Sequence, residues 1–386
     1  MKKQRLKEIE MLRTLAFFFV IMQHALGSAP SDFSMSAGWV TVANFLMVIA
    51  EPGVAIFLFI SGLTIAYSYK ENMDIKRYYK NRFLYLIIPY FIFSYINMLL
   101  YNPDRISNFL GQTLAGNGGF HLWYMGMFIR LVIIFPVLIY VGRWLHKRNI
   151  VIRIFAFLAL LKGYMYVSIH QGGIKEGAAN FIFGQPTELQ MRFVNISILF
   201  WSIYVIFGMY AAFNYDIFKR VVLKYRYIVY GMFILTFYYK FSRQFDFVEY
   251  NLLFDIAYRT SNILMFYIVG EYVIKREVLS SVMGFISKYS YAGYMLHIYA
   301  LNRIIFPLRS VGIDHPVINA VISGIGATFL VTGMVYVITL IPKSKIITGV
   351  NDNFYHVKIA LNYLINSKLL NGRLIGRINK FKVLDD

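Results

Sequence analysis

The sequence predicts an all-α protein, a polytopic membrane helix bundle of about ten transmembrane helices with both termini cytoplasmic. Three observations predict this fold class. The chain of 386 residues is 58% hydrophobic and only 15% charged, whereas a soluble domain carries about 25% charged residues. Apolar runs long enough to cross a bilayer recur along the chain, and short clusters of Lys and Arg separate them.

The apolar runs define the positions of the expected spans. They lie at residues 11–29, 44–68, 83–101, 121–141, 151–169, 193–213, 227–240, 251–273, 282–305 and 316–341. The seventh run is short and the second is interrupted at Pro52-Gly53, so nine or eleven spans also fit the pattern. The first run is too long for a secretory signal and is interpreted as a retained span.

Two regions follow from this pattern. Residues 1–342 form the expected transmembrane domain, and residues 343–386 form a basic cytoplasmic tail. In the tail, apolar residues recur at helical spacing beside Lys and Arg. This pattern fits a helix lying on the inner leaflet, and a poorly ordered tail is the alternative.

The distribution of charge orients the bundle. With a cytoplasmic N-terminus, the inner segments hold 28 Lys and Arg residues, whereas the outer loops hold few, Lys240 among them. This asymmetry follows the positive-inside rule. It explains the net charge of +20 without a nucleic-acid partner. The chain has no cysteine, which excludes disulfides, thiol nucleophiles and thiolate metal sites. We expect a multi-pass protein of the cell (plasma) membrane.

Ionisable side chains inside the spans are the candidate functional residues, because burying one in hydrocarbon costs roughly 2.5 kcal/mol or more. In the first span, Arg13 and His24 are eleven residues apart and share one helix face. They are separated by about 16 Å along the axis. Glu10 lies on the same face and can pair with Arg13. One stripe thus carries an ion pair near the cytoplasm and an imidazole deep in the bilayer.

Other ionisable groups lie at similar depth. His297 lies in the ninth span, Arg130 in the fourth and Lys162 in the fifth, while Asp255 and Arg259 form a possible i,i+4 pair in the eighth. We expect a polar chamber in the outer half of the bundle to collect these groups. The alternative for each residue is a side chain that only pairs two helices.

The residue types favour group transfer. Histidine is a suitable general base near neutral pH. The chain has no G-x-S-x-G nucleophile motif and no His or carboxylate cluster at metal-ligand spacing. A buried base can deprotonate an acceptor hydroxyl, and a basic cytoplasmic opening suits a donor that carries phosphates.

Five motifs carry a resemblance to the acyltransferase-3 family of membrane proteins. The first span has the family's arginine, ten intervening residues and histidine, in EIEMLRTLAFFFVIMQH. The others, in the family's order, are GVAIFLFISGLTI, KRYYKNRFLYLIIPY, HLWYM and KYSYAGYMLHIY. The third of the five is most similar to the branch of intercellular-adhesin polysaccharide acyltransferases, which modify biofilm polysaccharides.

The resemblance implies an O-acyltransferase that uses cytoplasmic acyl-CoA as co-substrate, with no permanently bound cofactor and no metal. It implies that Arg13 and Arg82, together with Arg77, hold the donor phosphates, and that Glu10 belongs to the donor-binding group as the partner of Arg13. His24 would deprotonate a hydroxyl of an extracytoplasmic surface polysaccharide, or would itself be acylated first. The expected partners are acyl-CoA, the surface glycan, the lipid bilayer, and a glycan synthase or export machinery.

Further motif residues are assigned to the acceptor side or the chamber, each with a structural alternative. They are Ser61, His121, Trp123, Tyr124, Arg130, Asp255, Arg259 and His297. For Ser61 and its neighbour Gly62, the alternative is close helix packing. For Trp123 and Tyr124, the alternative is an aromatic belt at the outer interface.

Two other functions remain open from the sequence. A polysaccharide or lipid-linked glycan exporter, or flippase, would also bury ionisable residues without acyl transfer. A signalling or scaffold protein is the third hypothesis, and the buried charges argue against it. The acyl group, acetyl or succinyl, is left undecided.

Overall fold

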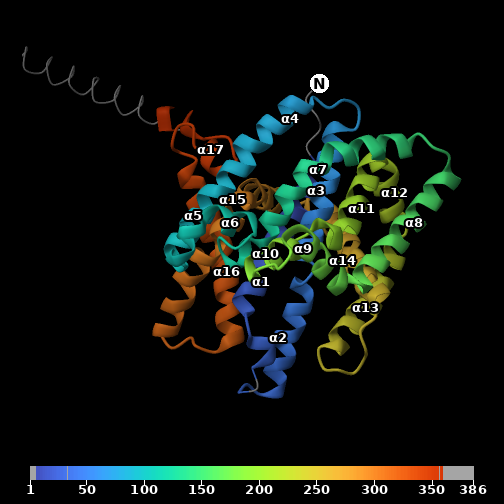
Figure 1. Ribbon diagram of the computed structural model, residues 1–386. Helices are drawn as coiled ribbons and strands as arrows, with labels where there is room; N and C mark the ends of the chain where they lie inside the picture. The colour runs from blue at the N-terminus through green and yellow to red at the C-terminus, as the bar shows by residue number, and fades with distance from the viewer. Residues whose placement is uncertain (1–5, 33, 356, 360–386) are drawn as a thin grey trace, which may run out of the picture.

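The computed structural model describes residues 6–32, 34–355 and 357–359, and in these ranges the chain forms helices and no strand (Figure 1). The all-α fold class is confirmed. The helices are α1 (Lys7–Leu26), α2 (Ala37–Ala50), α3 (Gly53–Tyr69), α4 (Ile75–Arg82), α5 (Ile88–Tyr101), α6 (Phe109–Leu114), α7 (Trp123–His146), α8 (Ile150–Ile169), α9 (Gln171–Phe183), α10 (Glu188–Asn195), α11 (Ser202–Phe213), α12 (Tyr215–Lys224), α13 (Arg226–Arg243), α14 (Leu252–Val273), α15 (Glu277–Ser310), α16 (Pro316–Ile338) and α17 (Lys345–Thr348).

Eight helical segments among the described residues are long and apolar enough to cross a membrane, and a ninth is added if α12 and α13, bent by 74°, form one span. The 34-residue α15 is not one of them. Its polar side chains, such as His297 and Asn302, interrupt the apolar run, yet its central part is buried in the bundle. The predicted boundaries agree best for α8, α14 and α16.

Helix starts follow local capping chemistry. The side chains of Asp74, Asn149 and Asn251 accept hydrogen bonds from backbone N–H groups at the starts of α4, α8 and α14. Such caps satisfy backbone donors that have no partner within the helix. The loops that join these spans therefore contain the signals that begin the next helix.

The first span occupies the centre of the bundle. α1 packs against α2, α3, α14, α15 and α16. Small residues allow these approaches: a Cβ on Gly293 of α15 would lie 2.8 Å from the ring of Phe17, and one on Gly324 of α16 would meet Met22. Glycine at helix contacts is the usual means of close packing in membranes. The stripe of α1 that carries Arg13 and His24 is therefore enclosed by other helices.

The second span is broken between α2 and α3, at Glu51 and Pro52, close to the interruption expected from the sequence. Gln23 of α1 donates a hydrogen bond of 2.7 Å to the carbonyl oxygen of Ala50 at the break. α3 then packs on α11 so closely that a Cβ on Gly62 would meet the backbone oxygen of Val205. Gly62 thus has the packing role that was the alternative for this motif.

Helices α4 and α17 lie at one end of the bundle. In Figure 1 both lie towards the top, and the turns joining α13 to α14 and α15 to α16 lie at the opposite end. The cytoplasmic position of both termini stays a prediction. Residues 360–386, where the helix on the inner leaflet was predicted, lie outside the described residues.

Candidate active site

Three histidines from distant parts of the chain meet inside the bundle. His24 comes from α1, His121 from the short helical turn Phe120–Leu122, and His297 from α15. The ring centroids of His24 and His297 are 5.1 Å apart, those of His121 and His297 are 4.9 Å apart, and those of His24 and His121 are 6.4 Å apart. His121 and His297 are 1% and 0% exposed, whereas His24 is half-buried.

The backbone of α15 fixes the two buried rings. Nδ1 of His297 lies 2.5 Å from the carbonyl oxygen of Tyr294, and Nε2 of His121 lies 3.4 Å from that of Met295. The Tyr294 hydroxyl also donates to the carbonyl oxygen of His121. A carbonyl oxygen only accepts, so the nitrogen facing it carries the hydrogen and the other nitrogen of a neutral ring is an acceptor.

These acceptor nitrogens, Nδ1 of His121 and Nε2 of His297, are buried and have no hydrogen-bond partner within the part of the chain that the structure describes. Buried polar atoms are normally paired, so an unpaired one points to a ligand or a function. Despite the three imidazoles, no three His, Asp or Glu side chains of the described residues are arranged to hold a metal ion.

A cavity of about 220 Å³ opens beside this cluster. It is lined by His24, Asn97, Tyr101, Asn102, Gly119, Phe120, His121, Ile298, Leu301, Asn302 and Ile305. The ring of Phe120 packs edge-on against His24, with centroids 5.2 Å apart. His24 and His121 both line the cavity, and His24 is the half-buried one of the two, whereas His297 is not among the lining residues.

A basic region lies at the other end of the α1 stripe. Arg13 is half-buried, and Glu10, Tyr124 and Arg82 lie near enough to interact with its guanidinium. The guanidinium of Arg82 lies 5.4 Å from the ring centroid of Tyr78. Arg82 ends α4, directly before a π-helical turn, a feature that often marks functional sites.

Tyrosines connect this basic region to the histidines. Tyr124 is buried, near Arg13, and its ring centroid is 5.6 Å from that of Tyr294. The ring of Tyr294 in turn lies 5.5 Å from that of His297. The interpretation of Tyr124 as an interface residue is therefore wrong, because the fold buries it between α3 and α15. Ser61 donates a hydrogen bond of 2.7 Å to the carbonyl oxygen of Phe57.

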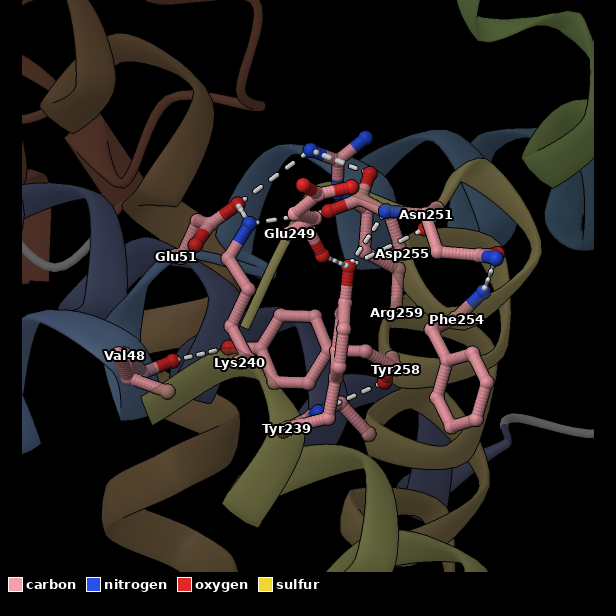
Figure 2. A network of polar contacts seen from close by, with 11 residues as sticks. Val48, Glu51, Tyr239, Lys240, Glu249, Asn251, Phe254, Asp255, Tyr258 and Arg259 are labelled. Carbon is pink, nitrogen blue, oxygen red and sulfur yellow. Dashed lines mark hydrogen bonds and ion pairs between the residues drawn. The ribbon is translucent and has the colours of Figure 1, made fainter. Parts of the chain in front are cut away.

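A second polar cluster lies at the break between α2 and α3 (Figure 2). Nζ of Lys240 lies 2.7 Å from Glu51 and 2.9 Å from Asp255, and the guanidinium of Arg259 lies 3.3 Å and 3.1 Å from the same two carboxylates. The predicted pairing of Asp255 with Arg259 is confirmed. Two cations and two anions leave this ion-pair network neutral, which permits its burial.

Similarity to known proteins identifies the family of the chain. The profile of the family described as "Acyltransferase domain" (Acyl_transf_3) matches residues 6–341. The chain belongs to the acyltransferase-3 family. It is also 23% identical over 321 residues, 76% of this chain and 81% of the relative, to a Bacillus subtilis (strain 168) protein named "Putative membrane-bound acyltransferase YfiQ". No solved structure matches the chain. The protein is therefore a multi-pass membrane O-acyltransferase.

Within this acyltransferase-3 protein, the predicted chamber is only partly correct. The structure brings His24, His121 and His297 together, but neither Asp255 nor Arg259 lines their cavity. Lys162 is exposed on the outer face of α8, so its predicted place in the chamber is wrong. A long lysine side chain on a lipid-facing helix can reach the interface and needs no interior partner.

Three other predicted site residues have structural partners outside the cavity. Arg130 donates hydrogen bonds to the carbonyl oxygens of Phe193 and Leu114. Trp123 packs against Trp201, with ring centroids 5.9 Å apart. Arg77 is exposed, and its backbone N–H donates to the cap residue of α4.

The sequence reasoning missed several residues of this acyltransferase. Lys240 was assigned to an outer loop, which is wrong: it lies in α13 and is 5% exposed, because Glu51 and Asp255 neutralise it. The asparagines of the cavity were also missed. Asn97 lies within a predicted apolar span, and this was the available signal.

Proposed function

We propose that this acyltransferase moves an acetyl or succinyl group from cytoplasmic acyl-CoA to a hydroxyl of a cell-surface polysaccharide outside the plasma membrane. The single observation that supports this function is the position of His24. Its imidazole faces a cavity, lies against two buried histidines, and shares one helix stripe with a half-buried arginine at the opposite end.

In the proposed reaction, His24 is the general base. The acceptor hydroxyl oxygen attacks the thioester carbonyl carbon, and His24 takes the hydroxyl proton as the new C–O bond forms. The C–S bond then breaks, and the CoA sulfur leaves with the proton that His24 returns. The hydrogen of His297 faces a carbonyl oxygen of α15, so its ring presents an acceptor nitrogen, Nε2, that can stabilise a protonated His24.

The donor end of the proposal rests on Arg13 and Arg82. Two guanidinium groups near one another repel, and a diphosphate between them would relieve that repulsion and form charge-assisted hydrogen bonds. Arg13 lies about 16 Å from His24 along α1. An extended donor could therefore place its phosphates at the arginines and its thioester at the imidazole.

The test is acyl transfer from radiolabelled acyl-CoA in membranes that contain the protein and its glycan. We expect His24→Ala to lower transfer roughly 10²–10⁴-fold, the usual contribution of a general base. His170→Ala is the matched control, because His170 is exposed at the end of α8. Wild-type transfer by His24→Ala would refute this mechanism. Loss of glycan export with acylation intact would favour the exporter function instead.

A further inference from the structure

We infer that the cavity at His24 accepts one uncharged, hydroxyl-rich sugar ring and excludes a ring that bears a carboxylate. The inference rests on the proposed function, because it treats the cavity as the acceptor subsite. It goes beyond that function by defining which units of a mixed polysaccharide can be acylated.

The lining of the cavity, eleven residues in all, carries no acidic side chain, lysine or arginine. The polar groups besides the histidines are the amides of Asn97, Asn102 and Asn302 and the hydroxyl of Tyr101. The amides of Asn102 and Asn302 offer both donors and an acceptor, which matches a sugar hydroxyl that does both. Asn97 offers its acceptor oxygen, because its amide nitrogen donates to backbone carbonyl oxygens. A carboxylate in the same place would lose its hydration without gaining a cation, a costly exchange.

One wall of the cavity contains a histidine nitrogen that has no partner among the described residues. Nδ1 of His121 is buried and lacks a hydrogen donor among the described residues. Gly119 keeps the space beside it open: a Cβ there would lie 3.2 Å from this nitrogen and 3.4 Å from Oδ1 of Asn97. Two acceptor atoms thus face the same small space, and a sugar hydroxyl can donate there. A carboxylate has no hydrogen to donate and would be repelled.

The cavity is small enough to limit the size of its ligand. The cavity measures about 220 Å³, below the roughly 300–1,000 Å³ of pockets that hold drug-sized ligands. It therefore suits one ring at a time. Phe120 contributes an apolar ring at the rim, 59% exposed, against which the C–H face of a sugar can pack.

The nearest cation on α15 does not change this conclusion. Arg303 is exposed, does not line the cavity, and its guanidinium lies 4.9 Å from the ring centroid of Tyr299. A carboxylate bound inside the cavity would therefore have no cationic Lys or Arg partner among the lining residues.

The decisive experiment is mass spectrometry of surface glycans from cells with and without a working copy of the protein. We expect every acyl group that depends on the protein to lie on an uncharged ring. Acyl groups on carboxylate-bearing rings would overturn the inference while leaving the proposed function intact. No acyl group that depends on the protein, on any glycan, would instead overturn the proposed function.

A variant tests the role of the lining directly. Asn302→Asp places an anion in the cavity, and we expect at least a tenfold lower kcat/KM for the glycan with an unchanged KM for acyl-CoA. Arg303→Gln, at the adjacent exposed position, is the matched control. Transfer by Asn302→Asp at the wild-type rate would contradict the inference. Glycan analysis of the wild-type protein decides the question independently if the variant does not fold.

Discussion

Replacement of Lys240 by methionine tests the physical basis of the ion-pair network. The side chain of Lys240 is 6% exposed, and its Nζ contacts Glu51 at 2.7 Å and Asp255 at 2.9 Å (Figure 2). Methionine keeps much of the volume of lysine but removes the charge. The half-buried carboxylate of Glu51 and the buried one of Asp255 would then share only Arg259, and the network would carry one uncompensated negative charge.

The size of the effect follows from that unpaired charge. Removing one partner of a buried ion pair typically costs about 3–5 kcal/mol. At about 2 °C per kcal/mol for a long chain, the midpoint of thermal unfolding should fall by roughly 6–10 °C. The double variant Lys240→Met/Asp255→Asn restores neutrality, because it leaves only Glu51 opposite Arg259, and we expect it to recover most of the loss.

The assay measures the thermal midpoint of the purified protein in detergent. Unfolding is monitored as the loss of the monodisperse peak in size-exclusion chromatography after heating. The single variant, Asp255→Asn alone and the double variant are measured together, which gives a double-mutant cycle. A double variant no more stable than Lys240→Met would refute the reasoning. In that case, packing of the lysine stem, rather than charge balance, would explain the cost.

Two further predictions test the donor site and the packing of the bundle. Arg82→Ala should raise the KM for acyl-CoA roughly 10- to 100-fold, the value of one charged hydrogen bond. Lys76→Ala, which removes an exposed charge from the same helix, should leave that KM unchanged. Equal effects of the two variants on the KM would indicate a general loss of surface charge. Gly208→Ala should destabilise the protein by about 1–3 kcal/mol or more, because its Cβ would meet the backbone oxygen of Phe59. Gly231→Ala is the control, because a Cβ on Gly231 meets nothing within 4 Å. Equal unfolding temperatures for these two variants would contradict the packing between α3 and α11.

Local patterns in the sequence were sufficient for part of the site. The spacing of Arg13 and His24 predicts a shared face, because the period of a helix depends only on neighbouring residues. The structure agrees: one end of α1 lies near Arg82 and the other lies at the cavity. The break in the second span was also predictable, since proline cannot continue the hydrogen bonding of a helix.

Residues whose role depends on distant partners were predicted poorly. Lys240 was assigned to an outer loop because it stands at the end of the predicted seventh span, and nothing near it in the sequence shows that Glu51 will neutralise it. Asp255 and Arg259 were paired correctly as i,i+4 neighbours, but were placed in the wrong cluster. Lys162 was placed in the polar chamber because a charged residue within a span was expected to face the bundle interior, although α8 is a peripheral helix.

The sequence by itself determined the membrane environment, the helical class and the two ends of the α1 stripe, because hydropathy and helical period are properties of short segments. Only the tertiary structure decided that His121 and His297 join His24, that the cavity beside them is lined by asparagines, and that four charges compensate one another at the α2–α3 break. These contacts join helices far apart in the chain. Their geometry is set by which helix faces pack together, and close packing through small residues fixes that choice.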